Sequence, residues 1–269
     1  MAATTDIRRP GQIDRGDSSG VSSALPNGSR QAQALRSSTL SGHRMAVSRV
    51  IGALFLGGFV FYGIGTVMAN SVTGGSNFLA TISANKSLLV LGAFLILLNT
   101  ATDVGKGVLF FPILENHGKR TALGYLATMI IEVVFLGLGA LALLMIVPLA
   151  QHAGEAWANG VAALLVQTNL MAYVIGEAVI GFGAFFMAAL LLRARLIPGW
   201  LALSGMVGYA CLLSGQIAEI FGIHIGTYSV IPGFFFEVAM PVWLFTKGFQ
   251  PEAYAGGIAR RPNLTKGVA

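Results

Sequence analysis

Charge is scarce in this chain. Only 10% of its 269 residues are charged, against 55% that are hydrophobic, and the mean hydropathy is +0.73. A soluble domain usually carries about 25% charged residues, so water cannot be the main solvent of this chain. The apolar sequence falls into blocks of about 20 residues, the length that crosses a hydrocarbon core of about 30 Å. We therefore predict an all-α membrane protein.

Cysteine and histidine are also rare. A single cysteine, Cys211, excludes an intrachain disulfide and a thiolate metal cluster. The four histidines stand in tails, turns or span ends, and none lies within a span with carboxylates at metal-ligand spacing. The sequence also lacks a phosphate-binding loop and a credible serine nucleophile elbow. We expect neither a metal site nor a cofactor.

Six apolar segments predict six transmembrane helices in one bundle. Residues 1–44 are rich in Ser, Gly, Gln and Arg and predict a disordered, basic, cytoplasmic tail. Residues 45–249 would form the transmembrane domain, and residues 250–269 a cytoplasmic C-terminal tail. The half-polar connection 151–169 is expected to hold a surface helix around Trp157. The predicted spans are 46–69, 87–114, 122–149, 170–192, 200–221 and 229–249.

Basic residues gather on one side of these spans. Seven arginines stand before or at the start of the first span, and the opposite side has only Lys86. The first side also receives Lys119, Arg120, Arg193, Arg195, Lys247, Arg260, Arg261 and Lys266. By the positive-inside rule, we expect both termini of this multi-pass protein to lie in the cytoplasm, inside the plasma membrane. The net charge of +6 then meets anionic lipid, so we expect the bilayer and no nucleic acid as a partner.

Five carboxylates lie inside the predicted spans, and Lys106 is the only base there that stands away from the span ends. Placing charge in lipid costs roughly 2.5–3.5 kcal/mol per residue, so these groups should face the bundle interior or a cavity. Asn99, Asp103 and Lys106 are spaced four and three residues apart, so they share a helix face on which Asp103 and Lys106 can pair. The glutamates lack such a partner and either stay protonated or await a cation. The five are Asp103, Glu132, Glu177, Glu219 and Glu237.

Two of the glutamates have polar or small neighbours. Glu177 shares a helix face with Tyr173 and with Gly181, which should leave room beside the carboxyl for a backbone or a ligand. Glu219 stands close to Gln216 near the end of the fifth predicted span. These neighbours can hydrogen-bond to a carboxyl or help it to bind a ligand.

A proline follows the last of the five carboxylates. Pro241 stands four positions after Glu237 and has no N–H, so the carbonyl of residue 237 loses its helical hydrogen bond. Transport proteins often build polar sites from such free carbonyls. We therefore expect a ligand to bind among nine intramembrane residues, namely Asn99, Asp103, Lys106, Glu132, Tyr173, Glu177, Gln216, Glu219 and Glu237.

The excess of acids over bases inside the spans favours a transporter-like or ligand-binding bundle. Its ligand would be a proton, a small cation or a cationic amphiphile. An intramembrane enzyme, with a protonated carboxyl as general acid on a lipid or terpenoid substrate, is the alternative. Its acid would be one of Asp103, Glu132, Glu177 and Glu237. Its pocket would be lined by Phe182, Phe185, Phe186 and Trp243.

A structural or accessory membrane subunit is the third possibility. Protonated carboxyls would then hold neighbouring helices together through hydrogen bonds. Glycine-rich faces would bind a second copy of the chain or another membrane protein, because small residues allow helices to approach closely. Such faces carry Gly57, Gly63, Gly137 and Gly139.

Three groups of short motifs follow one another at a specific spacing. They are Phe-Pro-Ile-Leu at 111–114 with Ala-Leu-Gly-Tyr at 122–125, Arg-Ala-Arg-Leu-Ile-Pro at 193–198, and Trp-Leu-Phe-Thr-Lys-Gly-Phe at 243–249. Over about residues 46–249 the chain resembles a bacterial multispanning family known as domain of unknown function 4386. The resemblance implies a six-helix membrane protein and brings no established activity. The family pattern often has an arginine three positions before Glu132, where this chain has Met129.

Overall fold

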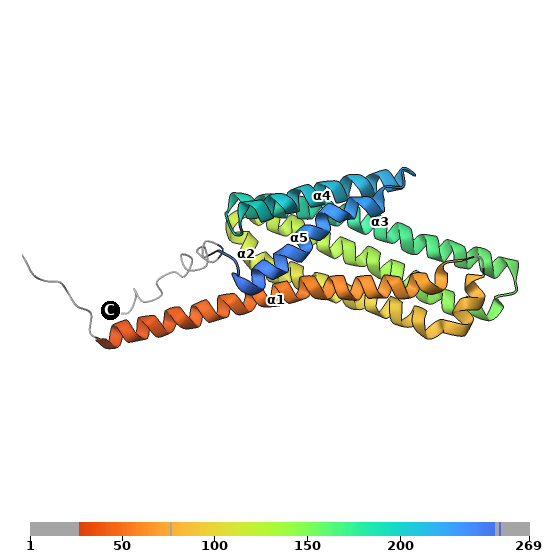
Figure 1. Cartoon of the computed structure of the whole chain (residues 1–269), viewed down its shortest axis with the longest axis horizontal. Helices are drawn as coiled ribbons and strands as arrows, with labels where there is room; N and C mark the ends of the chain where they lie inside the picture. Colours follow the sequence, from red (N-terminus) through yellow and green to blue (C-terminus); the bar gives the residue numbers. More distant parts are fainter. Residues whose placement is uncertain (1–26, 76, 251–252, 254–269) are drawn as a thin grey trace, which may run out of the picture. The chain divides into compact units, whose positions relative to one another are not determined.

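The structure, a computed structural model, describes residues 27–75, 77–250 and 253. These residues form α1 (Asn27–Thr73), α2 (Phe78–Leu149), the 3-10 helix η1 (Ala150–His152), α3 (Ala156–Arg193), α4 (Gly199–Ile220) and α5 (Gly226–Thr246) (Figure 1). All five α-helices are long and apolar enough to cross a membrane. The prediction of an all-α, multi-pass membrane protein is confirmed. The structure has five such helices where six spans are predicted, because α2 covers two of those spans.

The long helix α2 reverses direction within its length. Its backbone leaves helical geometry at Gly118 (φ −172°, ψ 80°), inside the basic turn 115–120. A Cβ atom on Gly107 would lie 3.5 Å from the Cβ of Met129. A straight helix would separate residues 107 and 129 by about 33 Å. The segments of α2 on either side of Gly118 therefore pack against each other, as Figure 1 shows.

Other helix bounds agree with the sequence to differing degrees. α4 and α5 begin and end within three residues of the predicted spans. The prediction of a separate surface helix within the connection 151–169 is wrong. α3 begins at Ala156, and Trp157 belongs to that long helix. α1 begins at Asn27, inside the predicted tail, while residues 1–26 and 254–269 lie outside the described residues. The division into tail, bundle and tail stays a prediction.

Glycine pairs bring helix backbones into direct contact. A Cβ atom on Gly65 of α1 would lie 2.8 Å from the carbonyl oxygen of Gly92 of α2. A Cβ atom on Gly208 of α4 would lie 2.6 Å from the Cα of Gly233 of α5. No side chain fits at such distances, so glycine permits both close approaches. These contacts fix α1 on α2 and α5 on α4.

Polar contacts tie the end of α5 and the residues after it to the middle of α1 and to the loop after α3. Arg49 Nε donates a hydrogen bond to the Phe245 carbonyl (3.4 Å), and the Phe249 amide donates to Ser48 Oγ (3.3 Å). The Gln250 amide donates to the Leu196 carbonyl (2.9 Å). The basic turn at Gly118 meets α3 near the same end, because a Cβ there would lie 3.0 Å from the Leu190 side chain. The basic loops therefore share one end of the bundle.

The core is divided into two apolar clusters. One lies toward the basic loops and includes Phe110, Phe236 and Leu244. The other includes Leu79 and Ile146, near the start and the end of α2. The polar residues described next lie between these clusters.

Candidate functional site

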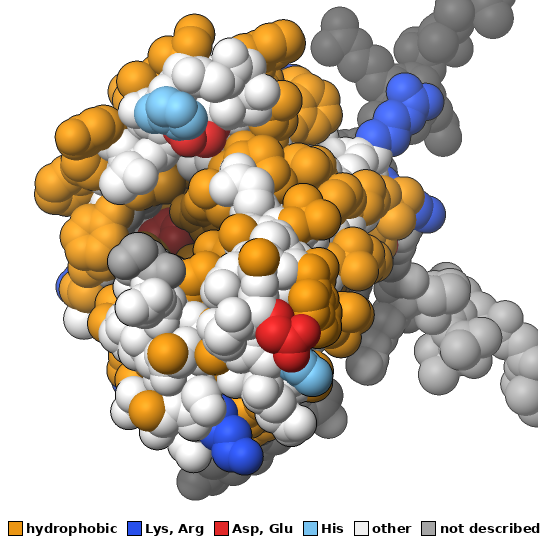
Figure 2. All heavy atoms as spheres, turned by 90° about the vertical axis from the view of Figure 1, so that its right-hand side faces the viewer, with side chains coloured by type: hydrophobic (Ala, Val, Ile, Leu, Met, Phe, Trp, Pro, Cys, Tyr) orange, Lys and Arg blue, Asp and Glu red, His pale blue; other side chains and the backbone are white. Residues whose placement is uncertain are grey.

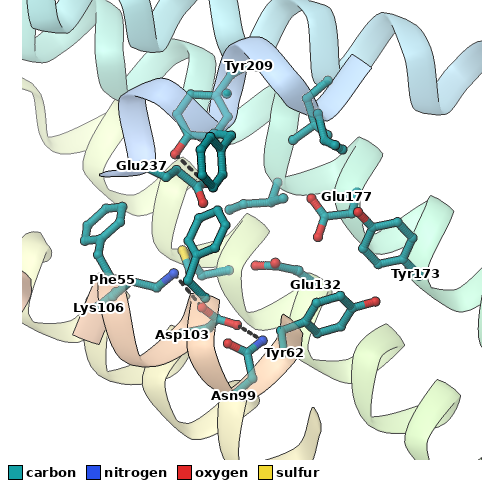
Figure 3. A pocket seen from close by; sticks show the side chains of 18 of the residues that line it. Phe55, Tyr62, Asn99, Asp103, Lys106, Glu132, Tyr173, Glu177, Tyr209 and Glu237 are labelled. Carbon is teal, nitrogen blue, oxygen red and sulfur yellow. Dashed lines mark hydrogen bonds and ion pairs between the residues drawn. The ribbon is translucent and has the colours of Figure 1, made fainter. Parts of the chain in front are cut away.

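A cavity of about 220 Å³ lies between the two apolar clusters. All five α-helices contribute to its wall. Seven of the nine predicted ligand-binding residues line it, so residues spread over more than 130 positions of sequence meet in one place (Figure 3). They are Asn99, Asp103, Lys106, Glu132, Tyr173, Glu177 and Glu237.

One part of the cavity, the paired half, consists of Asn99, Asp103, Lys106 and Phe55. Lys106 Nζ lies 2.6 Å from Asp103 Oδ1, and Asn99 Nδ2 donates a hydrogen bond to Asp103 Oδ2 (2.7 Å). The predicted ion pair is confirmed. Lys106 Nζ also lies 4.9 Å from the centre of the Phe55 ring, within cation–π range. The buried aspartate thus has a charged and a neutral partner on its own helix.

Glu237 has its partner on a neighbouring helix. The Tyr209 hydroxyl of α4 donates a hydrogen bond to Glu237 Oε1 of α5 (3.1 Å). Pro241 stands one turn later in α5 and cannot donate to the carbonyl of residue 237. Glu237 is therefore held by a hydrogen bond from the tyrosine hydroxyl of a neighbouring helix.

The other part of the cavity, the unpaired half, consists of Glu132, Glu177, Tyr62 and Tyr173. Glu132 is 6% exposed, and its Oε2 atom is buried without a hydrogen-bond partner. Within the described part of the chain, Glu177 makes neither a hydrogen bond nor an ion pair. The Tyr62 and Tyr173 rings stack beside these carboxyls, with centres 5.4 Å apart and an interplanar angle of 18°. Both carboxyls point toward the cavity in Figure 3.

Two of the predicted ligand-binding residues lie outside the cavity. Glu219 Oε2 accepts a hydrogen bond from the Gly226 amide (3.0 Å), and its Oε1 lies 2.7 Å from His224 Nδ1. Gln216 Nε2 donates to the Gly226 carbonyl (3.4 Å). Both side chains therefore hold the turn between α4 and α5, beyond the part of α4 that reaches the cavity.

Tyrosine is the residue type that sequence reasoning missed. Four of the six tyrosines line the cavity, and the nine predicted ligand-binding residues include Tyr173 but not Tyr62, Tyr125 or Tyr209. Tyrosine in membrane proteins usually stands at the membrane–water interface. A tyrosine in the middle of a span, far from either end, is the signal that could have indicated them.

The aromatic lining predicted for an enzyme pocket is wrong for this cavity. Phe182 and Phe186 are 55% and 47% exposed on α3, and neither Phe185 nor Trp243 reaches the cavity. Phenylalanines of α1 and α5 line it instead. The room expected beside Gly181 for a backbone or a ligand is filled by a backbone, because a Cβ there would lie 3.1 Å from the Leu213 backbone of α4.

One carboxylate outside the spans contrasts with those in the cavity. Glu155, between η1 and α3, lies 2.9 Å from His152 Nδ1 and accepts a hydrogen bond from the Trp157 indole. The hydrogen bonds of these two side chains lower the pKa of the exposed Glu155 carboxyl. Its neighbours thus favour its charged form in contact with water.

The cavity chemistry suits a positively charged ligand. Four carboxyls face one lysine, which is already paired with Asp103. Aromatic rings attract cations over their faces. Across the described residues, no group of three or more His, Cys, Asp or Glu side chains is arranged to hold a metal ion. The unpaired half can therefore accept a proton or a cation with few fixed ligands.

The comparisons with known proteins identify a family and no activity. No curated protein and no solved structure matches the chain significantly. A family model described as a domain of unknown function matches residues 50–248, which include every cavity residue named above. The chain belongs to that family, domain of unknown function (DUF4386), as the motifs of its sequence predict.

Proposed function

We propose that this chain is a transporter-like or ligand-binding membrane protein whose cavity binds a small cation or protons. The proposal rests on Glu132, whose Oε2 atom is buried without a hydrogen-bond partner. A buried polar atom without a hydrogen bond destabilises a protein by about 1–3 kcal/mol, and by more when it is charged. A bound cation or proton would supply the missing partner of Glu132 and of Glu177 beside it.

The proposal includes a topology of six membrane crossings. α2 spans 72 residues, about 108 Å if straight, and its reversal at Gly118 divides it into two segments that can each cross a 30 Å core. The basic loops lie at one end and would face the cytoplasm with both termini. The opposite end is hollowed, and acidic side chains are visible within the recess in Figure 2. In a bacterial plasma membrane, a ligand would then reach the cavity from outside the cell.

Cysteine labelling on intact cells tests the topology. In a Cys211→Ser background, Thr227→Cys should react with a membrane-impermeant maleimide from outside. Lys119→Cys should react only after the cells are permeabilised. Labelling of Lys119→Cys in intact cells, with Thr227→Cys protected, would reverse the proposed orientation. Equal labelling of both in intact cells would exclude it.

Titration calorimetry on the protein in nanodiscs tests the binding function. The ligands are ammonium, methylammonium, sodium and protons, and the variants are Glu132→Gln, Glu177→Gln and the control Glu219→Gln. We expect at least one cation or proton to bind the wild type. Its affinity should fall at least tenfold in both cavity variants and stay unchanged in Glu219→Gln, which lies outside the cavity. Equal binding by all four proteins, or by none, would overturn the proposal.

The aromatic lining supports an intramembrane enzyme as the second function. Phe55, Phe59 and Phe234 lie with four tyrosines around the carboxyls, a surrounding that could enclose a lipophilic substrate next to a general acid. Incubation of the purified protein with lipid extract, followed by mass spectrometry, distinguishes the two functions. A product formed by wild type and absent with Glu132→Gln and Glu177→Gln would favour the enzyme.

A further inference from the structure

The cavity wall has an opening between α1 and α5. Gly63 of α1 lines the cavity and is itself exposed, and a Cβ atom on it would meet no atom within 4 Å. Phe234 of α5 also lines the cavity and is 47% exposed. Residues that belong to both the cavity and the outer surface mark a place where the two connect.

This opening is closed on the side of the basic loops. The rings of Phe59 and Phe234 meet edge to face, with centres 5.3 Å apart. Closer to the basic end, Gly52 of α1 lies against α5, because a Cβ there would lie 3.4 Å from the Pro241 carbonyl oxygen and from the Leu244 side chain. From this contact toward the end opposite the basic loops, α1 and α5 diverge, as Figure 1 shows. The opening therefore lies toward the end opposite the basic loops.

Exposed apolar side chains stand within about one helical turn of Gly63 on α1 and of Phe234 on α5. On α1, Val60, Ile64 and Val67 are 51%, 50% and 69% exposed, and on α5, Ile231 and Phe235 are 51% and 65% exposed. Hydrophobic side chains also border the recess in Figure 2. In a membrane-spanning bundle such side chains contact lipid tails. A molecule that passes between α1 and α5 would enter from the bilayer, whereas one that uses the hollowed end would enter from water.

We propose, resting on the cation-binding function above, that the ligand is a single-chain lipophilic amine. Its ammonium head would lie between Glu132 and Glu177, and its hydrocarbon chain would leave between α1 and α5 into the bilayer. The cavity of about 220 Å³ is smaller than the roughly 300–1,000 Å³ of pockets that enclose a drug-sized ligand, so it suits a head group without its tail. A phospholipid head group fits less well, because its phosphate would lie among carboxylates.

The experiment uses the full chain in phosphatidylcholine nanodiscs, with empty nanodiscs to correct for partitioning. Four ligands separate the contributions of the positive charge and of the hydrocarbon chain to binding. Octylammonium has both, methylammonium lacks the long chain, octanol lacks the charge, and octylphosphocholine is a zwitterion. The obstructing variant is Gly63→Leu, with Gly63→Ala as a smaller obstruction. Gly124→Leu is the matched control, since Gly124 is also exposed with no atom within 4 Å of an added Cβ and lies away from the cavity.

We expect octylammonium to bind the wild type at least tenfold more tightly than octanol or octylphosphocholine. Gly63→Leu should weaken octylammonium at least tenfold and Gly63→Ala by less, while methylammonium, which enters from water, keeps its affinity. Gly124→Leu should leave both amines unchanged. If Gly63→Leu has no effect on octylammonium, or if octylphosphocholine binds as tightly, the lipophilic amine and its lateral route are wrong. Cation binding in the cavity would still stand, because only the calorimetry described above, with equal binding by all four proteins or by none, would remove it.

Discussion

The two halves of the cavity contain similar acidic side chains in different surroundings. Asp103 has Asn99 and Lys106 on its own helix, so its partners are in place as soon as that part of α2 forms. Glu132 and Glu177 lie on α2 and α3 and meet only in the assembled bundle, where Glu132 is left with a buried oxygen that has no partner. The two kinds of carboxylate thus differ in their partners rather than in their acidity, and this difference is the basis for the ligand site that we propose at Glu132 and Glu177.

The partners of the acidic side chains also explain why the membrane-spanning bundle tolerates them. An ion pair within one helix enters the membrane as a nearly neutral unit, which reduces the free energy needed to bury it. A lone glutamate must instead take up a proton or a cation. The paired half therefore has its partners within the chain, whereas a proton or the proposed ligand would supply those of the unpaired half.

The largest change in the free energy of unfolding is expected when the Asp103–Lys106 ion pair of the paired half is removed. Lys106→Met should lower the free energy of unfolding by about 3–5 kcal/mol, because it leaves Asp103 buried without its charged partner. Chemical denaturation in detergent, followed by circular dichroism, measures the change. The double variant Asp103→Asn with Lys106→Met should recover most of the loss, since it also removes the uncompensated charge. A single variant as stable as the wild type would show that the ion pair has no structural role.

The unpaired half should respond in the opposite way. Glu132→Gln should leave the free energy of unfolding within about 0.5 kcal/mol of wild type, because no hydrogen bond of Glu132 Oε2 is lost. The same variant should weaken ligand binding at least tenfold, about 1.4 kcal/mol. Denaturation and calorimetry on one preparation compare the two effects. Loss of stability with unchanged binding would make Glu132 a structural residue and remove the contrast between the halves.

Much of this arrangement could be predicted from local sequence. The spacing of Asn99, Asp103 and Lys106 predicts their common face, and the apolar blocks predict α4 and α5 within three residues. Both rest on distances along a single helix, which the helical repeat determines. The predicted start of the fourth span at residue 170 is too late, because α3 has 38 residues. Its length of about 57 Å extends well beyond a 30 Å core, so its first turns are half-polar.

The parts that could not be predicted depend on how helices pack. Tyr62 and Tyr209 join the cavity because α1 and α4 turn those faces inward, and nothing near them in sequence specifies this rotation. Glu219 shows the reverse case, since its place near the end of α4 lets it hold the following turn instead. Gly181 allows a close approach by α4, and from sequence alone that cannot be distinguished from space for a ligand. Sequence thus predicts which residues need a partner better than it predicts the partner.

Glu237 has a hydrogen-bonding partner but no charged one, so its loss of partner should change the free energy of unfolding by an intermediate amount. Tyr209→Phe removes the one hydrogen bond that this carboxyl accepts from a side chain in the described structure. Hydrogen bonds between membrane helices contribute about 0.6 kcal/mol on average and up to about 1.7 kcal/mol, so we expect a loss of about 1 kcal/mol in unfolding free energy. The Glu237→Gln variant should lose less, because an amide oxygen can still accept from Tyr209. A larger loss in Glu237→Gln than in Tyr209→Phe would contradict this assignment.

The smallest effect is expected at Glu155, whose partners lie in water. Because His152 and Trp157 lower the pKa of its carboxyl in the folded protein, the resulting stability is present above the ordinary pKa of a glutamate, about 4.3. It is lost as the pH falls through the lowered folded value. The Tm difference between wild type and Glu155→Gln should therefore be small and constant near pH 6–7, and should shrink below about pH 4. Solvent screens such exposed pairs, so added salt should reduce the difference further. If Glu155→Gln lowered the free energy of unfolding as much as Lys106→Met in the same chemical denaturation, a charged partner would matter equally in water and in the bundle. Burial would then no longer explain why the cavity carboxylates differ from Glu155.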